Sequence, residues 1–309
     1  MADARLRVAI VTRLPDDLSQ ALNACHDCLG HDAASGGILP DITVAVTTSM
    51  AGADARLFDS LPDLRLLACQ GAGLDRIDLA SAKKRGIIVA NTPDILTNDV
   101  AEFAVALMMA TARRVVEADV FVRAGRWTEE RMKPATRLSG KTVGVVGLGK
   151  IGHAVAERSE ALGMSVAWHG PRAKAGARWD YEPSLLALAA RCDVMILTVP
   201  GGSDTRALIG TPVLAALGPS GWLINVSRGS VVDEGALIDA LSNGIIAGAG
   251  LDVYAQEPAI DPRFAGMSNV VLAPHYASIT QEARREIIDL ILSNIDNFAA
   301  GQQINDAAA

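Results

Sequence analysis

Short apolar runs rich in β-branched residues alternate with helical segments along the chain, and this alternation is the strongest constraint on its fold. The runs are continuously apolar, which is typical of parallel strands covered by helices on both faces. The predicted strands are, in chain order, Leu6–Val11, Ile42–Thr47, Leu64–Cys69, Ile87–Ala90, Thr142–Val146, Ser165–Trp168, Val194–Val199, Trp222–Val226, Ala247–Val253 and Val270–Leu272. The sequence therefore predicts an α/β chain of two doubly wound parallel-sheet units in tandem.

A long helical stretch and a polar loop separate the two series of strands. The helix is predicted over Asp99–Ala124, the loop over Gly125–Gly140, and a final helix over Thr280–Phe298. The chain has 309 residues, a length that itself suggests two domains.

Charge and hydropathy exclude several classes of function. The formal net charge is −7, whereas nucleic acids and anionic membranes require a basic face on their partners. The opening segment Met1–Thr12 does not resemble a signal peptide, and the apolar stretch Phe103–Ala112 is too short to span a bilayer. We therefore expect a cytoplasmic protein whose main partner is a small molecule.

The cysteines predict no metal site and no redox site. Cys25 and Cys28 form a C-x-x-C pair, but no second pair or His-x-x-His completes a zinc site. On a helix the two thiols would lie one turn apart and share a face.

The sharpest local motif is Gly147-Leu148-Gly149-Lys150-Ile151-Gly152, which follows one predicted strand and opens the helix Ile151–Leu162. Gly147 suits a tight turn, Gly149 suits close approach of a pyrophosphate, and Gly152 suits close helix–strand packing. The start of the helix offers unpaired N–H groups to phosphates. In this strand–turn–helix context the motif predicts a bound dinucleotide.

The next predicted strand ends at Trp168-His169-Gly170-Pro171-Arg172, where no carboxylate stands. NAD-binding proteins usually place Asp or Glu about 20 residues after the glycine loop to bind the ribose hydroxyls. Here Arg172, with Lys174 behind it, suits a 2′-phosphate instead. We therefore expect His169 to Arg172 to border the cofactor, with NADPH preferred and NADH as the alternative.

Three polar residues follow three late strands. Arg228, Glu257 and His275 come shortly after the predicted strands Trp222–Val226, Ala247–Val253 and Val270–Leu272. The carboxyl ends of parallel strands open on one edge of a sheet, so these side chains are expected to converge.

These residue types suit the reduction of a 2-oxo acid by hydride transfer, which builds negative charge on the carbonyl oxygen. Arg228 can hold the substrate carboxylate or polarise the carbonyl, and a protonated His275 can donate a proton as the hydride arrives. Glu257 beside the imidazole would favour its charged form and fix its orientation.

With these motifs the chain resembles the D-isomer-specific 2-hydroxyacid dehydrogenases, and within them the glyoxylate/hydroxypyruvate reductase branch. The resemblance extends over nearly the whole chain in family order. The matching segments are Gly71-Ala72-Gly73-Leu74-Asp75-Arg76-Ile77-Asp78, Val89-Ala90-Asn91-Thr92-Pro93, the glycine loop, Asn225-Val226-Ser227-Arg228-Gly229, Leu251-Asp252-Val253-Tyr254 with Glu257-Pro258, and Pro274-His275 with Ser278.

The resemblance implies roles for individual residues. Arg228 would bind substrate, Glu257 would be the partner of the imidazole, and His275 would be the proton donor. Backbone N–H groups around Ala72 and Gly73, with Leu74 beside them, would hold the substrate carboxylate. Asp252 would bind the nicotinamide carboxamide, and the other cofactor contacts would be Val199, Pro200, Thr205, Val226, Ser227 and Ala277. The chain departs from the family pattern at Tyr276 and at Gly201-Gly202.

The resemblance also implies a Rossmann-like cofactor domain, residues 99–284, inserted into a flavodoxin-like substrate domain, residues 1–98 plus 285–309. The two long helices would be the crossings, and the domains would close over substrate. A homodimer joined through the cofactor domain is expected, with Gly125–Gly140 and Trp127 near the interface.

Other functions on this scaffold remain to be separated. A formate- or phosphite-type dehydrogenase would place Gln where Glu257 stands, and a phosphoglycerate dehydrogenase would carry a regulatory tail. A nicotinamide-sensing corepressor or scaffold would not need all of Arg228, Glu257 and His275. The sequence does not specify the physiological 2-oxo acid, the direction of the reaction or the effect of Tyr276 on the pocket.

Overall fold

The computed structural model describes residues 5–30 and 37–308. The chain divides into two compact units, Met1–Leu96 with Thr280–Ala309, and Thr97–Ile279. The sequence had placed the boundaries after residue 98 and before residue 285. Residues 1–4 of the opening segment discussed above lie outside the described part of the chain.

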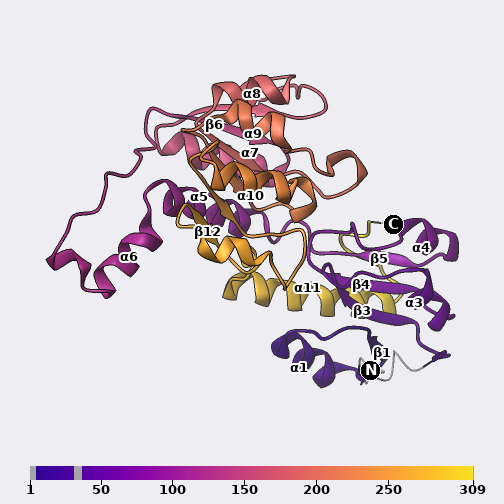
Figure 1. Cartoon of the computed structure of the whole chain (residues 1–309). Coiled ribbons are helices and arrows are strands. Elements are labelled where there is room, and N and C mark those ends of the chain that lie inside the picture. Colours follow the sequence, from indigo (N-terminus) through magenta and orange to yellow (C-terminus); the bar gives the residue numbers. More distant parts are fainter. Residues whose placement is uncertain (1–4, 31–36, 309) are drawn as a thin grey trace. The chain divides into compact units, whose positions relative to one another are not determined.

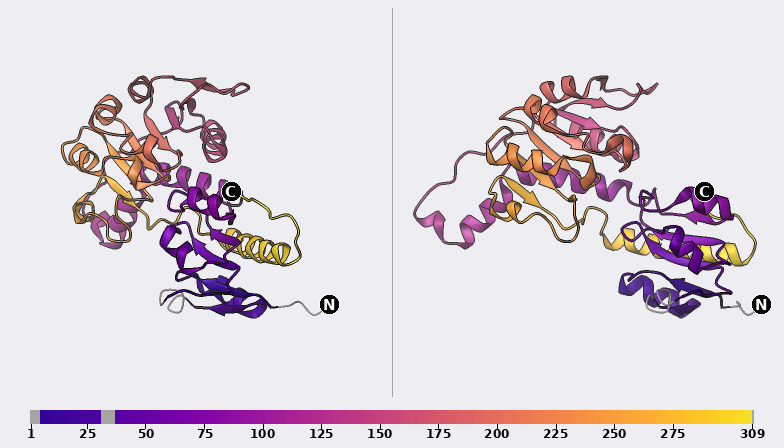
Figure 2. Two further views of the ribbon diagram at one scale, coloured as in Figure 1. Left: turned by 90° about the vertical axis from the view of Figure 1, so that its right-hand side faces the viewer. Right: turned by 45° about the vertical axis from the view of Figure 1, so that its right-hand side comes forward.

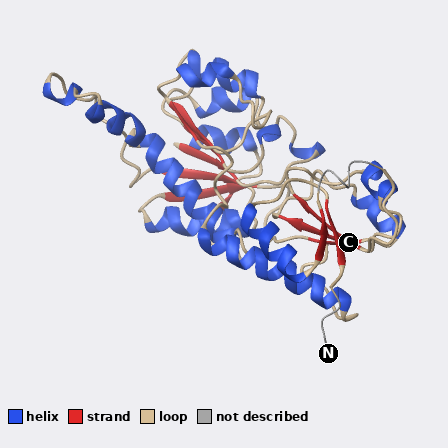
Figure 3. Cartoon of the chain, turned by 90° about the horizontal axis from the view of Figure 1, so that it is seen from below, coloured by secondary structure: helices blue, strands red, loops and turns tan. Residues whose placement is uncertain are grey.

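The first unit is built on a five-stranded parallel sheet with the order β2-β1-β3-β4-β5 (Figure 1). Its strands are β1 (Arg7–Ile10), β2 (Asp27–Leu29), β3 (Val44–Thr48), β4 (Leu66–Gln70) and β5 (Ile88–Ala90). Its helices are α1 (Asp16–Cys25), α3 (Ala55–Ser60), α4 (Leu79–Arg85) and α11 (Gln281–Ala299). The long helix α11 packs against β4 and α1, so the last helix of the chain completes the first unit (Figure 3).

The second unit contains a seven-stranded parallel sheet with the order β12-β11-β10-β9-β6-β7-β8 (Figure 2). Its strands are β6 (Thr142–Val146), β7 (Ser165–His169), β8 (Asp180–Tyr181), β9 (Val194–Leu197), β10 (Trp222–Asn225), β11 (Gly248–Leu251) and β12 (Val270–Leu272).

Helices cover the seven-stranded sheet. The helices α5 (Thr97–Ala112) and α7 (Lys150–Ala161) pack against each other; α5 contacts β10 to β12, and α7 contacts β6 and β7. The helices α8 (Leu185–Arg191), α9 (Thr211–Leu217) and α10 (Glu234–Ser242) form another packed group, in which α8 contacts β6 and β7. Short 3-10 segments lie at η1 (Arg126–Thr128), η2 (Ser203–Thr205), η3 (Gly229–Val231) and η4 (Pro262–Gly266).

The prediction of two parallel-sheet α/β units is confirmed, but two short strands escaped it. The strands β2 and β8 have three and two residues, and each pairs with one neighbour at the edge of its sheet. Such short edge strands carry little apolar pattern, and only pairing with β1 or β7 makes them strands. Cys28 lies in β2 and Cys25 ends α1, so the suggestion that the two thiols share a helix face was wrong.

The single helix predicted over Asp99–Ala124 was also wrong, because two helices occupy this stretch. The helix α5 ends at Ala112, and α6 (Val115–Arg123) begins after Arg114, which has a left-handed φ of 53°. The Arg114 guanidinium is held by Glu117, with Nε 2.7 Å from Oε2 and Nη2 2.6 Å from Oε1. Figures 1 and 2 both show α6 standing apart from the seven-stranded sheet.

Within the described residues, no helix is long and apolar enough to cross a membrane. The same part of the chain contains no cluster of three or more His, Cys, Asp or Glu side chains that could hold a metal ion.

Candidate functional site

The glycines of the loop between β6 and α7 have three different environments. Gly147 has a φ of 96°, and a Cβ there would lie 2.7 Å from Cγ1 of Val199. A Cβ on Gly152 would lie 2.0 Å from the carbonyl oxygen of Gly147, so the start of α7 packs directly on the turn. A Cβ on Gly149 would meet nothing within 4 Å. Gly149 is therefore not required by the packing of the protein itself, and it leaves open space for a ligand.

A cavity of about 600 Å³ lies over this loop, and three basic side chains, Lys150, His153 and Lys174, contribute to it. The Lys174 ammonium donates a hydrogen bond of 2.6 Å to the carbonyl oxygen of Leu148, which ties this lysine to the glycine loop. Arg172 is not part of the cavity lining. The lining residues are Thr97, Leu148, Gly149, Lys150, His153, Ala154, Lys174, Ala175, Gly176 and Ala177.

The segment that follows β7 is ordered by β8 and the residue after it. Nδ1 of His169 lies 2.9 Å from the carbonyl oxygen of Glu182, and the hydroxyl of Tyr181 donates to the carbonyl oxygen of Gly170 at 3.0 Å. Pro171 and Arg172 are exposed. The sequence missed β8, and with it the contacts that fix this end of the predicted cofactor site.

Further predicted cofactor residues of this unit follow β9 and β10. Val199 packs against Gly147, and the hydroxyl of Thr205 donates to the carbonyl oxygen of Pro200 at 2.7 Å. Val226 and Ser227 are buried directly after β10.

His275 and Glu257 are in direct contact. Nδ1 of His275 lies 2.7 Å from Oε2 of Glu257, and Oε1 of the same carboxylate accepts the N–H of Tyr254 at 2.9 Å. The carboxylate side chain is only 12% exposed and the imidazole 29%. Because Glu257 is held from two sides, it fixes the orientation of the imidazole through Nδ1, and Nε2 is the ring nitrogen that points away from this carboxylate.

Asp252 organises the backbone around His275. His275 has a φ of 55°, and its N–H donates to the carbonyl oxygen of Asp252 at 2.8 Å. The buried Asp252 carboxylate accepts the N–H of Tyr276 at 2.6 Å and that of Ala277 at 3.0 Å. Burial raises the pKa of Asp252 above its usual value, although these two N–H groups oppose the shift. Asp252 therefore holds the turn, a role that the sequence did not indicate.

The loop that contains Arg228 is held by Asn225 and packs on the loop before Glu257. The Asn225 side chain accepts the N–H of Ser227 at 3.0 Å and donates to the carbonyl oxygen of Arg228 at 3.1 Å. A Cβ on Gly229 would lie 1.8 Å from the carbonyl oxygen of Tyr254. Only glycine permits this approach, which brings the loops after β10 and β11 together.

Tyr254 is a further residue of the site, and the sequence alone assigned it no role. Its hydroxyl lies 3.1 Å from the carbonyl oxygen of Leu251 and 2.8 Å from that of Ala273. Burial raises the pKa of Tyr254 to about 12, so the hydroxyl stays protonated and donates at neutral pH. The ring therefore links the ends of β11 and β12, on which Glu257 and His275 depend.

Tyr276, one of the two departures from the family pattern, packs against α5. Its ring makes an edge-to-face contact with Phe103 at a centroid distance of 6.1 Å and remains 49% exposed.

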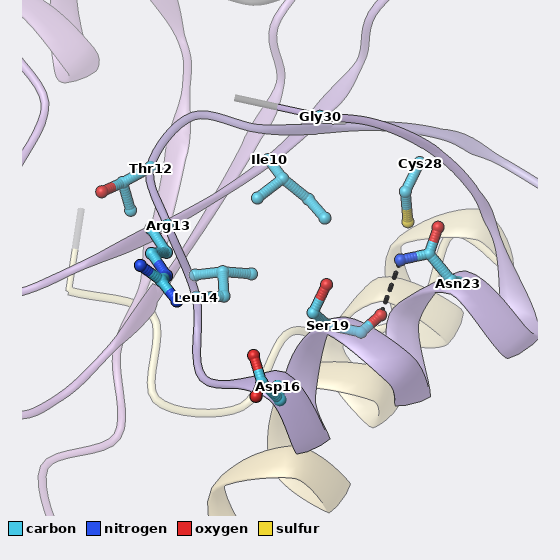
Figure 4. A pocket seen from close by; sticks show the side chains of 9 residues that line it. All are labelled: Ile10, Thr12, Arg13, Leu14, Asp16, Ser19, Asn23, Cys28 and Gly30. Carbon is cyan, nitrogen blue, oxygen red and sulfur yellow. Dashed lines mark hydrogen bonds between the residues drawn. The ribbon is translucent and has the colours of Figure 1, made fainter. Parts of the chain in front are cut away.

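The residues predicted to bind the substrate carboxylate belong to the first unit. Ala72, Gly73 and Leu74 follow β4, after Gly71 with its φ of 118°. A cavity of about 370 Å³ in the same unit lies beside α1 and does not include these residues (Figure 4). Its lining is Ile10, Thr12, Arg13, Leu14, Asp16, Ser19, Asn23, Cys28 and Gly30.

Most of the chain is similar to known proteins. Residues 105–277 match a model of the D-isomer specific 2-hydroxyacid dehydrogenase NAD binding domain. The chain is 41% identical to hydroxyphenylpyruvate reductase of Plectranthus scutellarioides, over 85% of this chain and 84% of that protein. It is 45% identical to 2-ketogluconate reductase of Gluconobacter oxydans, over 84% and 83% of the two chains.

A solved structure is similar over almost the full length. It is that of NADPH-dependent glyoxylate/hydroxypyruvate reductase from Sinorhizobium meliloti, in complex with NADP and malonate. The TM-score is 0.92, the sequences are 36% identical, and the match covers 99% of this chain and 97% of that one.

The two glycines of the loop should respond differently to alanine. Gly152→Ala should lower the free energy of unfolding of the second unit by about 1–3 kcal/mol, because the new methyl group overlaps the Gly147 carbonyl. Gly149→Ala should leave the melting temperature unchanged but weaken dinucleotide binding, since its methyl group points into open space. Thermal denaturation and titration with a dinucleotide check both. Equal loss of stability in the two variants would contradict the assignment of Gly149 to ligand approach.

Proposed function

Since the chain belongs to the D-isomer-specific 2-hydroxyacid dehydrogenases, in their glyoxylate/hydroxypyruvate reductase branch, we propose that it reduces a small 2-oxo acid to the D-2-hydroxy acid. The observation that most supports this is the 2.7 Å contact between His275 and Glu257, on the strand ends of a unit that also holds the glycine loop. Glyoxylate, hydroxypyruvate and related 2-oxo acids are the proposed substrates.

The bound nicotinamide cofactor would supply the hydride, and the side chains of this chain would do the rest. Arg228 binds the substrate carboxylate or polarises its carbonyl through the planar guanidinium. His275, held by Glu257, donates a proton from Nε2 to the developing alkoxide. The backbone N–H groups of Ala72 and Gly73 hold the substrate carboxylate.

The direct test is the decrease of NADPH absorbance with glyoxylate, hydroxypyruvate and phenylpyruvate. We expect turnover with at least one of the three. No turnover with any 2-oxo acid, together with tight dinucleotide binding, would favour the nicotinamide-sensing corepressor or scaffold. Oxidation of formate or phosphite would favour a formate- or phosphite-type dehydrogenase. Glu257 disfavours this reading, because such an enzyme would place Gln at this position.

His275→Asn should lower kcat by roughly 10²–10⁴-fold, because the proton donor is lost. Glu257→Gln should also lower kcat, since it keeps the shape of the side chain but weakens the charge-assisted hydrogen bond that orients the imidazole. Neither change should weaken NADPH binding more than about twofold, since neither removes a proposed cofactor contact. Steady-state kinetics and fluorescence titration measure these effects, with the exposed Glu286→Gln on α11 as control. Full activity of His275→Asn would refute the proton-donor role.

NADPH is the proposed cofactor, and Lys174 rather than Arg172 is the residue that we propose contacts its phosphate. A relative of similar structure binds NADP, and Lys174 lies in the cavity over the glycine loop, whereas Arg172 does not line it. Lys174 could therefore turn from the Leu148 carbonyl to a bound phosphate. The absence of a carboxylate after β7 further supports this choice, because a carboxylate would repel the 2′-phosphate.

Lys174→Ala should reduce the ratio of kcat/KM for NADPH to that for NADH by roughly ten- to a hundredfold, because a charge-assisted hydrogen bond is lost. Arg172→Ala should have a smaller effect. Arg178→Ala is the matched control, since it removes the same charge from the same loop but from a side chain paired with Glu160. A wild-type preference for NADH would overturn the cofactor assignment.

We further propose that the chain forms a homodimer through α6 and the loop after it. Val115, Val116, Val120 and Val122 are 50–57% exposed on this short helix, and Trp127 is 61% exposed. Apolar side chains gathered on an element that stands apart from the sheet are typical of an interface. From the family resemblance only the loop Gly125–Gly140 and Trp127 were expected near the interface, and the valines of α6 extend that expectation.

Light scattering should give the mass of a dimer, and Val116→Asp with Val120→Asp should convert it to a monomer by placing charges in the apolar contact. Leu186→Asp is the control, because Leu186 is equally exposed, at 48%, but lies on α8. A monomeric wild type would exclude the proposed interface.

A further inference from the structure

Two buried polar residues after β5 hold the backbone of the loop after β4. The Asn91 side chain donates to the carbonyl oxygen of Ala72 at 2.8 Å. The N–H of Thr92 donates to the carbonyl oxygen of Gly71 at 3.1 Å, and the Thr92 hydroxyl accepts the N–H of Gly71 at 3.0 Å. Asn91 is 6% exposed and Thr92 is 1% exposed, so solvent offers little competition for these bonds.

These bonds set the direction of the two N–H groups proposed to bind the substrate carboxylate. A trans peptide unit is planar, and its C=O and N–H point in opposite directions. The Gly71 carbonyl shares its peptide plane with the N–H of Ala72, so Thr92 orients that N–H. The Ala72 carbonyl shares its plane with the N–H of Gly73, so Asn91 orients that one.

We propose that Asn91 and Thr92 are positioning residues that fix the Ala72 and Gly73 N–H groups in the orientation that binds the substrate carboxylate. The proposal rests on the 2-oxo acid reductase function and extends it to residues that touch neither substrate nor cofactor. A loop with freely rotating peptide planes would have to order itself on each binding event, at a cost in affinity.

The C-terminal segment helps to hold Asn91 in place. The backbone carbonyl oxygen of Asp306 accepts the N–H of Asn91 at 3.3 Å, and the N–H of Ala308 donates to the carbonyl oxygen of Val89 at 2.7 Å. Ala90 and Ala307 form an antiparallel bridge. The segment thus pairs with β5, which is otherwise the edge strand of the five-stranded sheet.

The last helix fixes this segment in place through one amide side chain. Asn294 of α11 donates to the carbonyl oxygen of Asn305 at 3.1 Å and accepts its N–H at 2.9 Å. Asn294 is 2% exposed. Contacts therefore run from α11 through the C-terminal segment to Asn91, and from Asn91 to the Ala72 carbonyl.

The first test is Asn91→Ala in the full chain. KM for glyoxylate or hydroxypyruvate should rise roughly five- to tenfold, as expected for the loss of one hydrogen bond that orients a binding group. The Kd for NADPH should stay within about twofold, because that site lies on other residues. The methyl ester of the same substrate should show little change in KM, because it carries no carboxylate charge. Asn23→Ala is the control, since it removes a similar side-chain bond, to Ser19, in the same unit.

A second variant leaves the buried Asn91 side chain in place and changes only the C-terminal segment. Ala308→Pro removes the N–H that bonds to Val89 from an exposed residue near the end of the described chain, so the protein should fold and its substrate KM should rise by roughly two- to threefold. The double variant with Asn91→Ala should be no worse than Asn91→Ala alone, because the C-terminal segment is proposed to act on the Ala72 carbonyl only through the Asn91 side chain. Additive effects would separate the C-terminal segment from Asn91 and overturn that part of the proposal.

Oxalate binding separates this proposal from the function on which it rests. If the wild-type protein neither reduces 2-oxo acids nor binds oxalate by calorimetry, the proposed reductase function and the positioning role are both refuted. If the wild type does turn over but Asn91→Ala leaves KM and the oxalate Kd unchanged, or raises the KM of the methyl ester equally, only the positioning role is refuted.

Discussion

The buried carboxylate of Asp252 is the interaction on which the proposed chemistry most depends. A histidine in the left-handed region is strained, and the turn persists because Asp252 binds the next two backbone N–H groups and accepts the N–H of His275 through its own carbonyl. Each of its carboxylate oxygens has a second lone pair, so a nicotinamide carboxamide could still be bound there. One residue thus shapes the turn that carries His275, the proposed proton donor, and is also a proposed cofactor contact.

Close backbone approach is the second requirement of the site. Gly152 lets α7 lie on the Gly147 turn, and Gly229 lets the loop after β10 lie against Tyr254. In both places a methyl group would overlap a carbonyl oxygen. The parallel strands place Arg228, Glu257 and His275 after the same edge of the sheet. Glycines at the contacts then let the loops and the helix α7 approach one another closely.

Much of this arrangement could be read in the sequence because it is encoded locally. The continuously apolar strands, the glycine loop and the positions of Arg228, Glu257 and His275 after strands all follow from short patterns. What the sequence missed was mostly non-local: the edge strands β2 and β8, and the contacts of Asp252 and Asn91. Lys174 looked like a neighbour of Arg172, but a hydrogen bond to Leu148, 26 residues away, sets its place.

The sequence by itself determined the α/β class, the dinucleotide loop and the identity of the polar residues that follow the late strands, because strand and turn propensities act over a few residues. Only the tertiary structure decided which backbone groups those residues hold. Asn91 and Ala72 are 19 positions apart, and Tyr276 and Asp252 are 24 apart. No local pattern marks such pairs, because the partner of a buried polar group is chosen by the packing of whole strands and helices around it.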